Sequence, residues 1–233
     1  MINLELVNRV GNLFRSQIAE LGYELEIQSE FRDLAAIAES YKHDITPHFH
    51  PATNTFFWSE AFWIAVKHDD KVIGYCAAKR QDVGNEGLLA YNLRYWERTY
   101  GSPDAPVVFE EQQSRELAKI TGKLIYSGAW YMSKDHRNSH IGKLLGQYVQ
   151  CHAFAEWRDT DYFYIFMDSN DVGTGLGAAL ELKDQVVDAL HWRECPAPAK
   201  PNYWLLGCSR EWFEDWLMRK LVRHDRSAKA SKE

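Results

Sequence analysis

Hydrophobic side chains recur along the chain at two spacings, which divide it into helices and strands. In residues 2–21 they recur at helical spacing, which predicts an amphipathic helix that Gly22 ends. Alternating or continuous apolar runs predict strands over residues 23–28, 62–67, 72–79, 124–132, 162–167 and 203–208. Further helices are expected over residues 31–41, 88–100, 110–120, 141–157, 178–190 and 211–222.

Short polar segments mark where these elements begin and end. Ser29 is the expected N-cap of the second helix, and the sequence HDDK over residues 68–71 predicts a hairpin turn. Residues 43–58 are rich in His and aromatic side chains and contain two prolines, which predicts a loop or an irregular helix. The domain organisation expected is an N-terminal helix (1–22), one mixed α/β (α+β) domain (23–223) and a disordered tail (224–233).

Composition narrows the classes of protein that this chain can represent. Its 233 residues, 45% of them hydrophobic, suffice for one large domain with a substantial core. A formal net charge of -6 argues against a general nucleic-acid-binding surface, which needs clustered Lys and Arg. We expect neither a membrane span nor a secretory signal, and four cysteines without a C-x-x-C pair predict reduced thiols in a cytoplasmic protein.

One unit of strand, polar loop and helix carries the strongest chemical signal. The first turn of a helix leaves backbone N–H groups without partners, and the helix dipole makes that end electropositive. Gly142 permits a close approach to the backbone, while Arg137 and Lys143 add positive charge. These features predict a pyrophosphate site, although the loop matches neither a Walker A nor a G-x-G-x-x-G pattern. The alternative is an ordinary strand–helix connection with a solvated loop.

The stretch M-S-K-D-H-R-N-S-H-I-G-K-L-L resembles the acyl-CoA signature of the GNAT N-acetyltransferase superfamily. Met132 matches the end of the signature strand, Arg137 the leading R/Q and Gly142 the final Gly, while His140 stands where the family usually has its first Gly. Residues 62–79, with the phrase K-V-I-G-Y, and residues 162–167 are similar to neighbouring strands of that fold. The resemblance implies a GNAT acyl-CoA N-acyltransferase fold, with a mixed central sheet that is splayed in the middle and helices on both faces.

The same resemblance implies an acetyl-CoA-dependent N-acetyltransferase, in which an amine attacks the thioester directly. It places pantetheine against the backbone of Trp130, Tyr131 and Met132. It places the pyrophosphate on Arg137, Asn138, Ser139, His140, Ile141, Gly142 and Lys143. The family often supplies a Tyr as acid after the diverging strand, but this chain has no Tyr between Asp168 and Trp192. The alternatives there are Asn170, Ser169, a water or no acid at all, and Asn170 is also expected to contact the cofactor. Tyr126, Glu110 and Glu111 are the candidate bases.

Several alternatives stay open. Residues 84–122 are an insertion where the family has a tight turn, and they either build an acceptor pocket or decorate the surface. His48 and His50 lack an acidic partner at a recognisable spacing, so no metal site is expected. The expected partners are acetyl-CoA and the amine of a small molecule or peptide, without nucleic acid or membrane and with homodimer formation left open. Competing interpretations are a catalytically degenerate GNAT domain that senses acyl-CoA or mediates interactions, and an aminoacyl-transferase that uses charged tRNA.

Overall fold

The computed structural model describes residues 2–102, 107–137, 140–196 and 199–230. Its centre is a seven-stranded sheet with the strand order β1-β2-β3-β5-β6-β9-β7, and a two-stranded ribbon of β4 and β8 lies apart from it. In the large sheet β5 and β6 run parallel, and all other neighbours are antiparallel. The strands are β1 (Glu24–Gln28), β2 (Ala61–His68), β3 (Lys71–Gly84), β4 (Val108–Phe109), β5 (Gly122–Met132), β6 (Tyr162–Asp168), β7 (Asp184–Val186), β8 (Trp192–Glu194) and β9 (Tyr203–Ser209).

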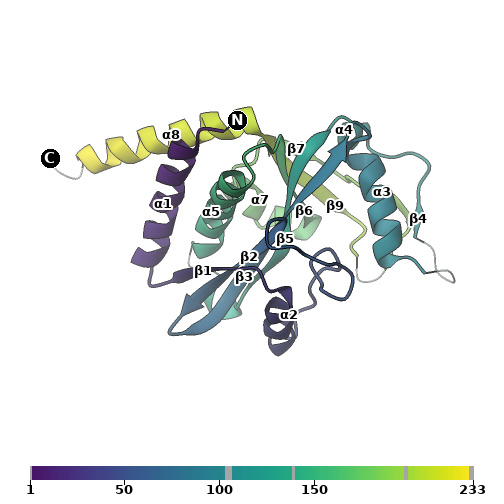
Figure 1. Ribbon diagram of the computed structural model, residues 1–233, viewed down its shortest axis with the longest axis horizontal. Coiled ribbons are helices and arrows are strands. Elements are labelled where there is room, and N and C mark those ends of the chain that lie inside the picture. The colour runs from purple at the N-terminus through teal and green to yellow at the C-terminus, as the bar shows by residue number, and fades with distance from the viewer. Residues whose placement is uncertain (1, 103–106, 138–139, 197–198, 231–233) are drawn as a thin grey trace.

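Helices cover both faces of this sheet, as the sequence predicted (Figure 1). One face packs against α1 (Leu4–Glu20), α5 (Ile141–Glu156) and α8 (Arg210–Ala230). The other packs against α2 (Phe31–Ser40) and α3 (Gly87–Tyr100). Short helical turns complete the fold: α4 (Arg115–Ala118), η1 (Lys134–His136), α6 (Ser169–Gly173) and α7 (Leu176–Ala179). No helix in the described residues combines the length and the apolar character needed to cross a bilayer.

The first helix shows how the hydrophobic spacing becomes packing. Asn3 caps α1 through its side-chain oxygen, which accepts a hydrogen bond from the Leu6 amide at 3.1 Å. Val10, Phe14 and Ile18 then fall on one face and are buried against α5 and α8. Each such side chain contributes about 1.5–3 kcal/mol on burial. Gly22 ends the helix with φ 85°, as predicted.

The middle of the sheet opens because β5 and β6 pair along part of their length. The parallel pairing covers Leu124–Ser127 and Tyr162–Ile165. Beyond it β5 stays with β3, and β6 stays with β9, so the two strands part. A bulge adds one residue to β5 at Ala129, whose φ is 50°, and bulges bend the strand that carries them. The splayed mixed sheet expected from the sequence is therefore confirmed.

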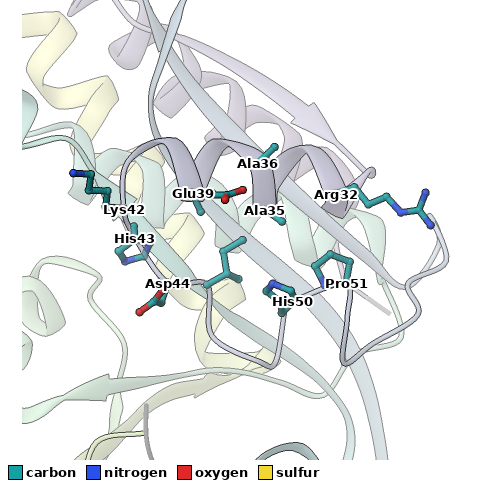
Figure 2. A pocket seen from close by; sticks show the side chains of 11 residues that line it. Arg32, Ala35, Ala36, Glu39, Lys42, His43, Asp44, His50 and Pro51 are labelled. Carbon is teal, nitrogen blue, oxygen red and sulfur yellow. The ribbon is translucent and has the colours of Figure 1, made fainter.

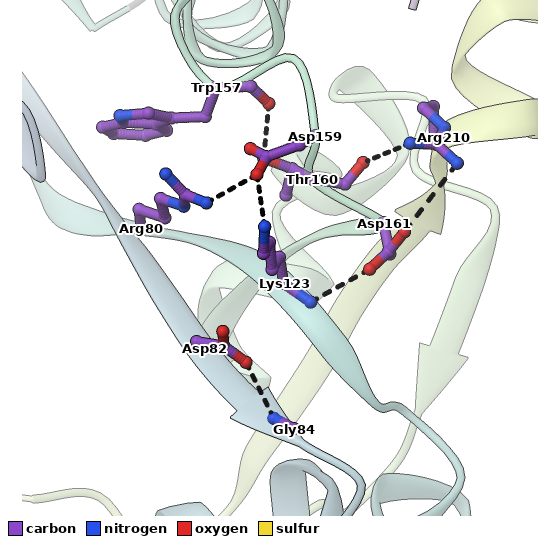
Figure 3. Close-up of polar contacts among 9 residues, drawn as sticks. All are labelled: Arg80, Asp82, Gly84, Lys123, Trp157, Asp159, Thr160, Asp161 and Arg210. Carbon is purple, nitrogen blue, oxygen red and sulfur yellow. Dashed lines mark hydrogen bonds and ion pairs between the residues drawn. The ribbon is translucent and has the colours of Figure 1, made fainter. Parts of the chain in front are cut away.

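An ion-pair network fixes the start of this parallel pair (Figure 3). The Asp161 amide donates to the Lys123 carbonyl at 2.6 Å, and the Asp161 carboxylate accepts from the Lys123 amide at 3.0 Å. Asp159 binds the side chains of both Arg80 and Lys123, while Arg210 lies 3.8 Å from Asp161. The register of β5 on β6, and hence the point where they part, is anchored here.

Two helix predictions are wrong, one because residues with positive φ interrupt the helical pattern and the other because the segment starts in the β4–β8 ribbon. Residues 178–190 form the end of α7 and strand β7, since Glu181 (φ 55°) and Asp188 (φ 48°) are left-handed. Residues 110–120 contain one short helix, α4, after the backbone of Glu110 joins the β4–β8 ribbon. The apolar spacing alone did not predict β4, β7 or β8.

Predictions at two helix boundaries also need correction. Glu30, not Ser29, caps α2, because its carboxylate accepts from the Arg32 amide at 3.0 Å. The first half of α8 is buried in the core, so it nucleates a helix that good helix formers extend to Ala230. The segment expected to be a disordered tail is thus helical as far as Ala230. The four cysteines are free thiols, as expected.

Candidate functional site

The start of α5 leaves open space above its first turn. The buried side chain of Ile141 fixes the helix to the core, and His140 precedes it in the left-handed conformation with φ 66°. A Cβ added at Gly142 would meet no atom within 4 Å. Backbone amides at a helix start attract anions, so this turn fits a phosphate group. Asn138 and Ser139, which the sequence also assigned to the site, lie outside the described residues.

Two cationic side chains flank this turn, as the sequence predicted. Arg137 is exposed, and its Nε donates to the Met132 carbonyl at 3.0 Å, which ties the loop to the end of β5. Lys143 is less free than expected, because its Nζ lies 3.8 Å from Glu181. The same carboxylate also binds Lys220 at 2.7 Å. Arg137 is therefore the cation whose charge is more available to a ligand.

The end of β5 forms the wall that leads toward this turn. Trp130, Tyr131 and Met132 lie beyond the last residue paired with β6, so the edge of β5 that faces β6 has no strand partner there. The other edge of this segment is paired with β3, where Tyr131 faces Tyr75. Main-chain groups along an unpaired strand edge suit an extended, amide-bearing ligand such as pantetheine, although the Met132 carbonyl already accepts from Arg137.

The proposed catalytic residues do not form one cluster. Tyr126 is 4% exposed, next to the last paired residue of β5, and burial raises its pKa well above the ordinary value. Glu110 and Glu111 are exposed, and Glu110 belongs to the β4–β8 ribbon, where its carboxylate lies 3.9 Å from Arg193. Asn170 is also exposed, and its amides bind the Asp168 carboxylate at 2.8 Å. All four assignments stay predictions.

The structure adds a histidine that the sequence did not single out. His43 is half-buried, and its Nδ1 lies 2.7 Å from the Tyr75 hydroxyl. Its ring centre lies 4.9 Å from that of Tyr131, on the wall described above. Burial lowers the pKa of His43, and Arg137 adds to this shift while Asp44 opposes it. His43 lies in the loop expected after the second helix, but its contact with Tyr75 on β3 depends on tertiary structure.

A pocket of about 800 Å³ borders this histidine (Figure 2). Its lining comes from α2 and from the loop that follows α2, and includes Arg32, Glu39, His43, Asp44, His50 and Pro51. This pocket lies on the α2 side of the sheet, opposite the side that packs against α5.

No family model matches the chain, and no curated protein matches it by sequence. Solved structures do match in shape. Arabidopsis thaliana NAA60 in complex with acetyl-CoA aligns with TM-score 0.47 and 12% identity, over 80% of this chain and 98% of that one. FeeM, an N-acyl amino acid synthase from uncultured soil microbes, aligns with TM-score 0.45 and 12% identity, over 81% and 91%. A GNAT-family acetyltransferase from Bacillus anthracis aligns with TM-score 0.46 and 10% identity, over 80% and 95%.

At such identities and TM-scores these likenesses assign neither a family nor an activity to this chain. The topology of the chain itself is a mixed sheet with one parallel pair, a bulge in the first strand of that pair, and a helix that follows this strand. This strand order and divergence agree with the splayed mixed sheet that the resemblance to the GNAT acyl-CoA signature implies.

Proposed function

We propose that this protein is an acetyl-CoA-dependent N-acyltransferase, in which an amine attacks the thioester directly. The observation that carries the proposal is the combination of two features at one place. The strands β5 and β6 part after Ser127 and Ile165, and the turn at Gly142 on α5 adjoins open space. An extended ligand with a diphosphate at one end fits this combination.

The chain's own residues would hold the cosubstrate at two points. The first turn of α5, with Arg137 and Lys143, would bind the diphosphate. The free edge of β5 at residues 130–132 would bind pantetheine, and an amide near Met132 would stabilise negative charge on the reacting carbonyl oxygen. Acetyl-CoA, when bound, supplies an acyl group activated as a thioester. Holding the amine beside it provides the main catalytic effect, which is proximity.

His43 is the group that we assign to accept the proton of the attacking amine. A lowered pKa keeps its imidazole neutral near pH 7, and it borders both the pocket and Tyr131. The raised pKa of Tyr126 makes that side chain a proton donor rather than a base at neutral pH. The exposed Glu110 and Glu111 remain weaker candidates for the base, and Asn170 for a contact with the cosubstrate.

We expect His43→Gln to lower kcat by about 100-fold to 10,000-fold, the usual contribution of a general base. In the unchanged protein the rate should fall as the pH drops through the pKa of His43, below the ordinary value of 6.5. The measurement is a pH–rate profile of thiol release. His50→Gln, in the same pocket, is the control. Equal rates for the two variants would remove His43 from this role.

The proposed function itself is tested with two assays on the full chain. Acetyl-CoA should raise the melting temperature, because a ligand that binds the folded state stabilises it. Acetyl-CoA with a panel of small-molecule and peptide amines should then release free thiol with at least one amine. Absence of any stabilisation by acetyl-CoA would overturn the proposal.

Two observations favour a second candidate, an acyl-CoA-binding domain without catalysis that acts as a sensor or interaction module. His140 adopts φ 66° where the family usually has glycine, and the chain lacks a Tyr between Asp168 and Trp192. Stabilisation by acetyl-CoA without thiol release on any amine would favour this candidate over the enzyme.

A further inference from the structure

Lys79 is buried on the α2 and α3 side of the sheet, beside the point where β5 and β6 part. It is 6% exposed and faces Tyr126 across the β3–β5 register. Its Nζ donates to the His48 carbonyl at 3.1 Å and to the Tyr95 hydroxyl at 2.9 Å. Within the described part of the chain, none of the ion pairs includes Lys79. The ammonium group therefore lies in the interior without a carboxylate.

A buried lysine without a charged partner lowers the free energy of unfolding. A buried charge without a partner loses several kcal/mol of hydration, and two neutral oxygens compensate for part of it. The rings of Phe49, Tyr95 and Tyr126, at 4.3–5.7 Å from Nζ, add cation–π attraction. Burial, with Arg98 nearby, still lowers the pKa of Lys79 to about 7. A ligand that brings negative charge would remove this penalty.

The surroundings of Lys79 contain more hydrogen-bond donors than acceptors. His48 is 3% exposed, and neither of its ring nitrogens has a partner. The indole Nε1 atoms of Trp96 and Trp192 are also buried without partners, and an indole N–H can only donate. Ring centres lie 4.6 Å apart between His48 and Trp96, and 5.1 Å apart between Trp96 and Trp192. Burial and Lys79 lower the pKa of His48 well below its ordinary value, so its neutral ring has one donor and one acceptor nitrogen. A carboxylate, which only accepts hydrogen bonds, complements the donors, which are Lys79, one nitrogen of His48 and the indole N–H groups.

We propose that the acceptor amine carries a carboxylate, which Lys79 binds together with the free donors of His48 and Trp96. This inference rests on the proposed function, because it names the substrate class of the same site. Phe166 connects the two places: it is the first residue of β6 beyond the parallel pairing, and its ring centre lies 6.0 Å from Trp96 and 6.2 Å from Tyr126.

The loop that carries His48 separates Lys79 from the pocket beside α2. Its neighbours Ile45, His50 and Pro51 line the 800 Å³ pocket, while His48 points inward to the rings of Tyr95 and Trp96. A shift of this one loop would join the pocket to Lys79. The reacting amine would then lie toward the free edge of β5, and the carboxylate toward α3.

The test compares each standard α-amino acid with its amide and its decarboxylated amine. Binding is measured by calorimetry with and without CoA, and kcat/KM by thiol release from acetyl-CoA. We expect at least one acid to bind about tenfold to hundredfold more tightly than its amide, the range for a hydrogen bond to a charged group. Lys79→Met should reduce this preference to within about threefold. The proposal would be overturned if no amino acid with a free carboxylate bound. It would also be overturned if Lys79→Met weakened the binding of acids and amides equally.

Two controls separate this site from folding and from the proposed function. Lys79→Gln keeps a polar side chain without the charge, so it should lose the same preference, and the melting temperature reports whether each variant folds. Lys71→Met removes an exposed charge from the same strand and should change nothing. If acids bind through Lys79 while acetyl-CoA does not bind at all, the proposed function fails and the carboxylate site stands.

Discussion

At the residue scale, Gly142 is the position where binding and folding can be separated. A side chain there would point into open space, so the protein itself tolerates it. Gly142→Ala should leave the free energy of unfolding unchanged or raise it by up to about 1 kcal/mol, because Ala is the better helix former. The same methyl group would occupy the place of a phosphate. We expect the affinity for acetyl-CoA, measured by calorimetry, to fall about tenfold.

Larger substitutions at Gly142 distinguish charge from bulk. Gly142→Glu should abolish binding through repulsion of the diphosphate, while Gly142→Lys, of similar bulk, should retain part of it. Both variants should melt close to the unchanged protein. An undiminished affinity in Gly142→Glu would contradict the placement of the diphosphate at this turn.

The pKa of Lys79 leads to a second prediction at this scale, which concerns how the stability of the fold depends on pH. Its pKa is about 7 when folded and near the ordinary 10.5 when unfolded, so between these values the unfolded chain binds the extra proton. The contribution of Lys79 to the free energy of unfolding should therefore be constant below pH 7 and should rise with pH between about pH 7 and pH 10.5. The charged or titratable groups that face Lys79 are Arg98, Tyr95, His48 and Tyr126.

Urea denaturation across this pH range checks the effect. Lys79→Met should remove the rise and make the protein more stable near pH 7, because an apolar side chain replaces a buried charge. A variant that is less stable than the unchanged protein at every pH would show that Lys79 is retained for stability.

At the element scale, the start of the β5–β6 pair determines where the sheet opens. Gly122 adopts φ 88°, and a Cβ there would fall on Oδ2 of Asp161, the residue that anchors both strands. Gly122→Ala should cost about 2–4 kcal/mol, from the left-handed backbone and the displaced carboxylate. Gly84→Ala is the matched control, with φ 50° and no atom near its Cβ, and should cost about 1 kcal/mol. Equal losses in chemical denaturation would argue against the anchoring role.

Elements could be predicted from the sequence where the local pattern decides the structure. The run at residues 162–167 became β6 within one residue, because every side chain of a central strand has to be apolar. Residues 178–190 look helical by spacing, yet Glu181 and Asp188 adopt positive φ under the control of tertiary packing. The spacing of hydrophobic residues cannot reveal a residue other than glycine that adopts the left-handed backbone conformation.

The same distinction applies to the site. The turn that we propose to bind phosphate can be recognised in the sequence because its residues are contiguous, from Met132 to Lys143. The cluster around Lys79 could not, because His48 is 31 residues before it and Tyr95 is 16 residues after it. Their contact, and the burial that makes the lysine unusual, exist once the loop and α3 pack on the sheet.

At the scale of the whole molecule, the sheet separates the two regions that we propose as binding sites. The start of α5 belongs to the core shared with α1 and α8, whereas Lys79 and His43 face α2 and α3. The two regions meet where β5 and β6 part. The segment between β3 and β5, which includes α3, covers the second region and supplies Tyr95 and Trp96 to it. Under the proposed function, the cosubstrate and the acceptor would therefore reach one point from opposite faces.

The measurement that tests this account most directly is a calorimetric titration of the full chain with acetyl-CoA and with S-acetylpantetheine. The account places the diphosphate on α5, so acetyl-CoA should saturate one site per chain with roughly micromolar affinity. S-acetylpantetheine, which lacks the diphosphate together with the 3′-phosphoadenosine, should bind about 100-fold more weakly or not measurably. Equal affinities for the two compounds, or no saturable binding of acetyl-CoA, would contradict the central claim.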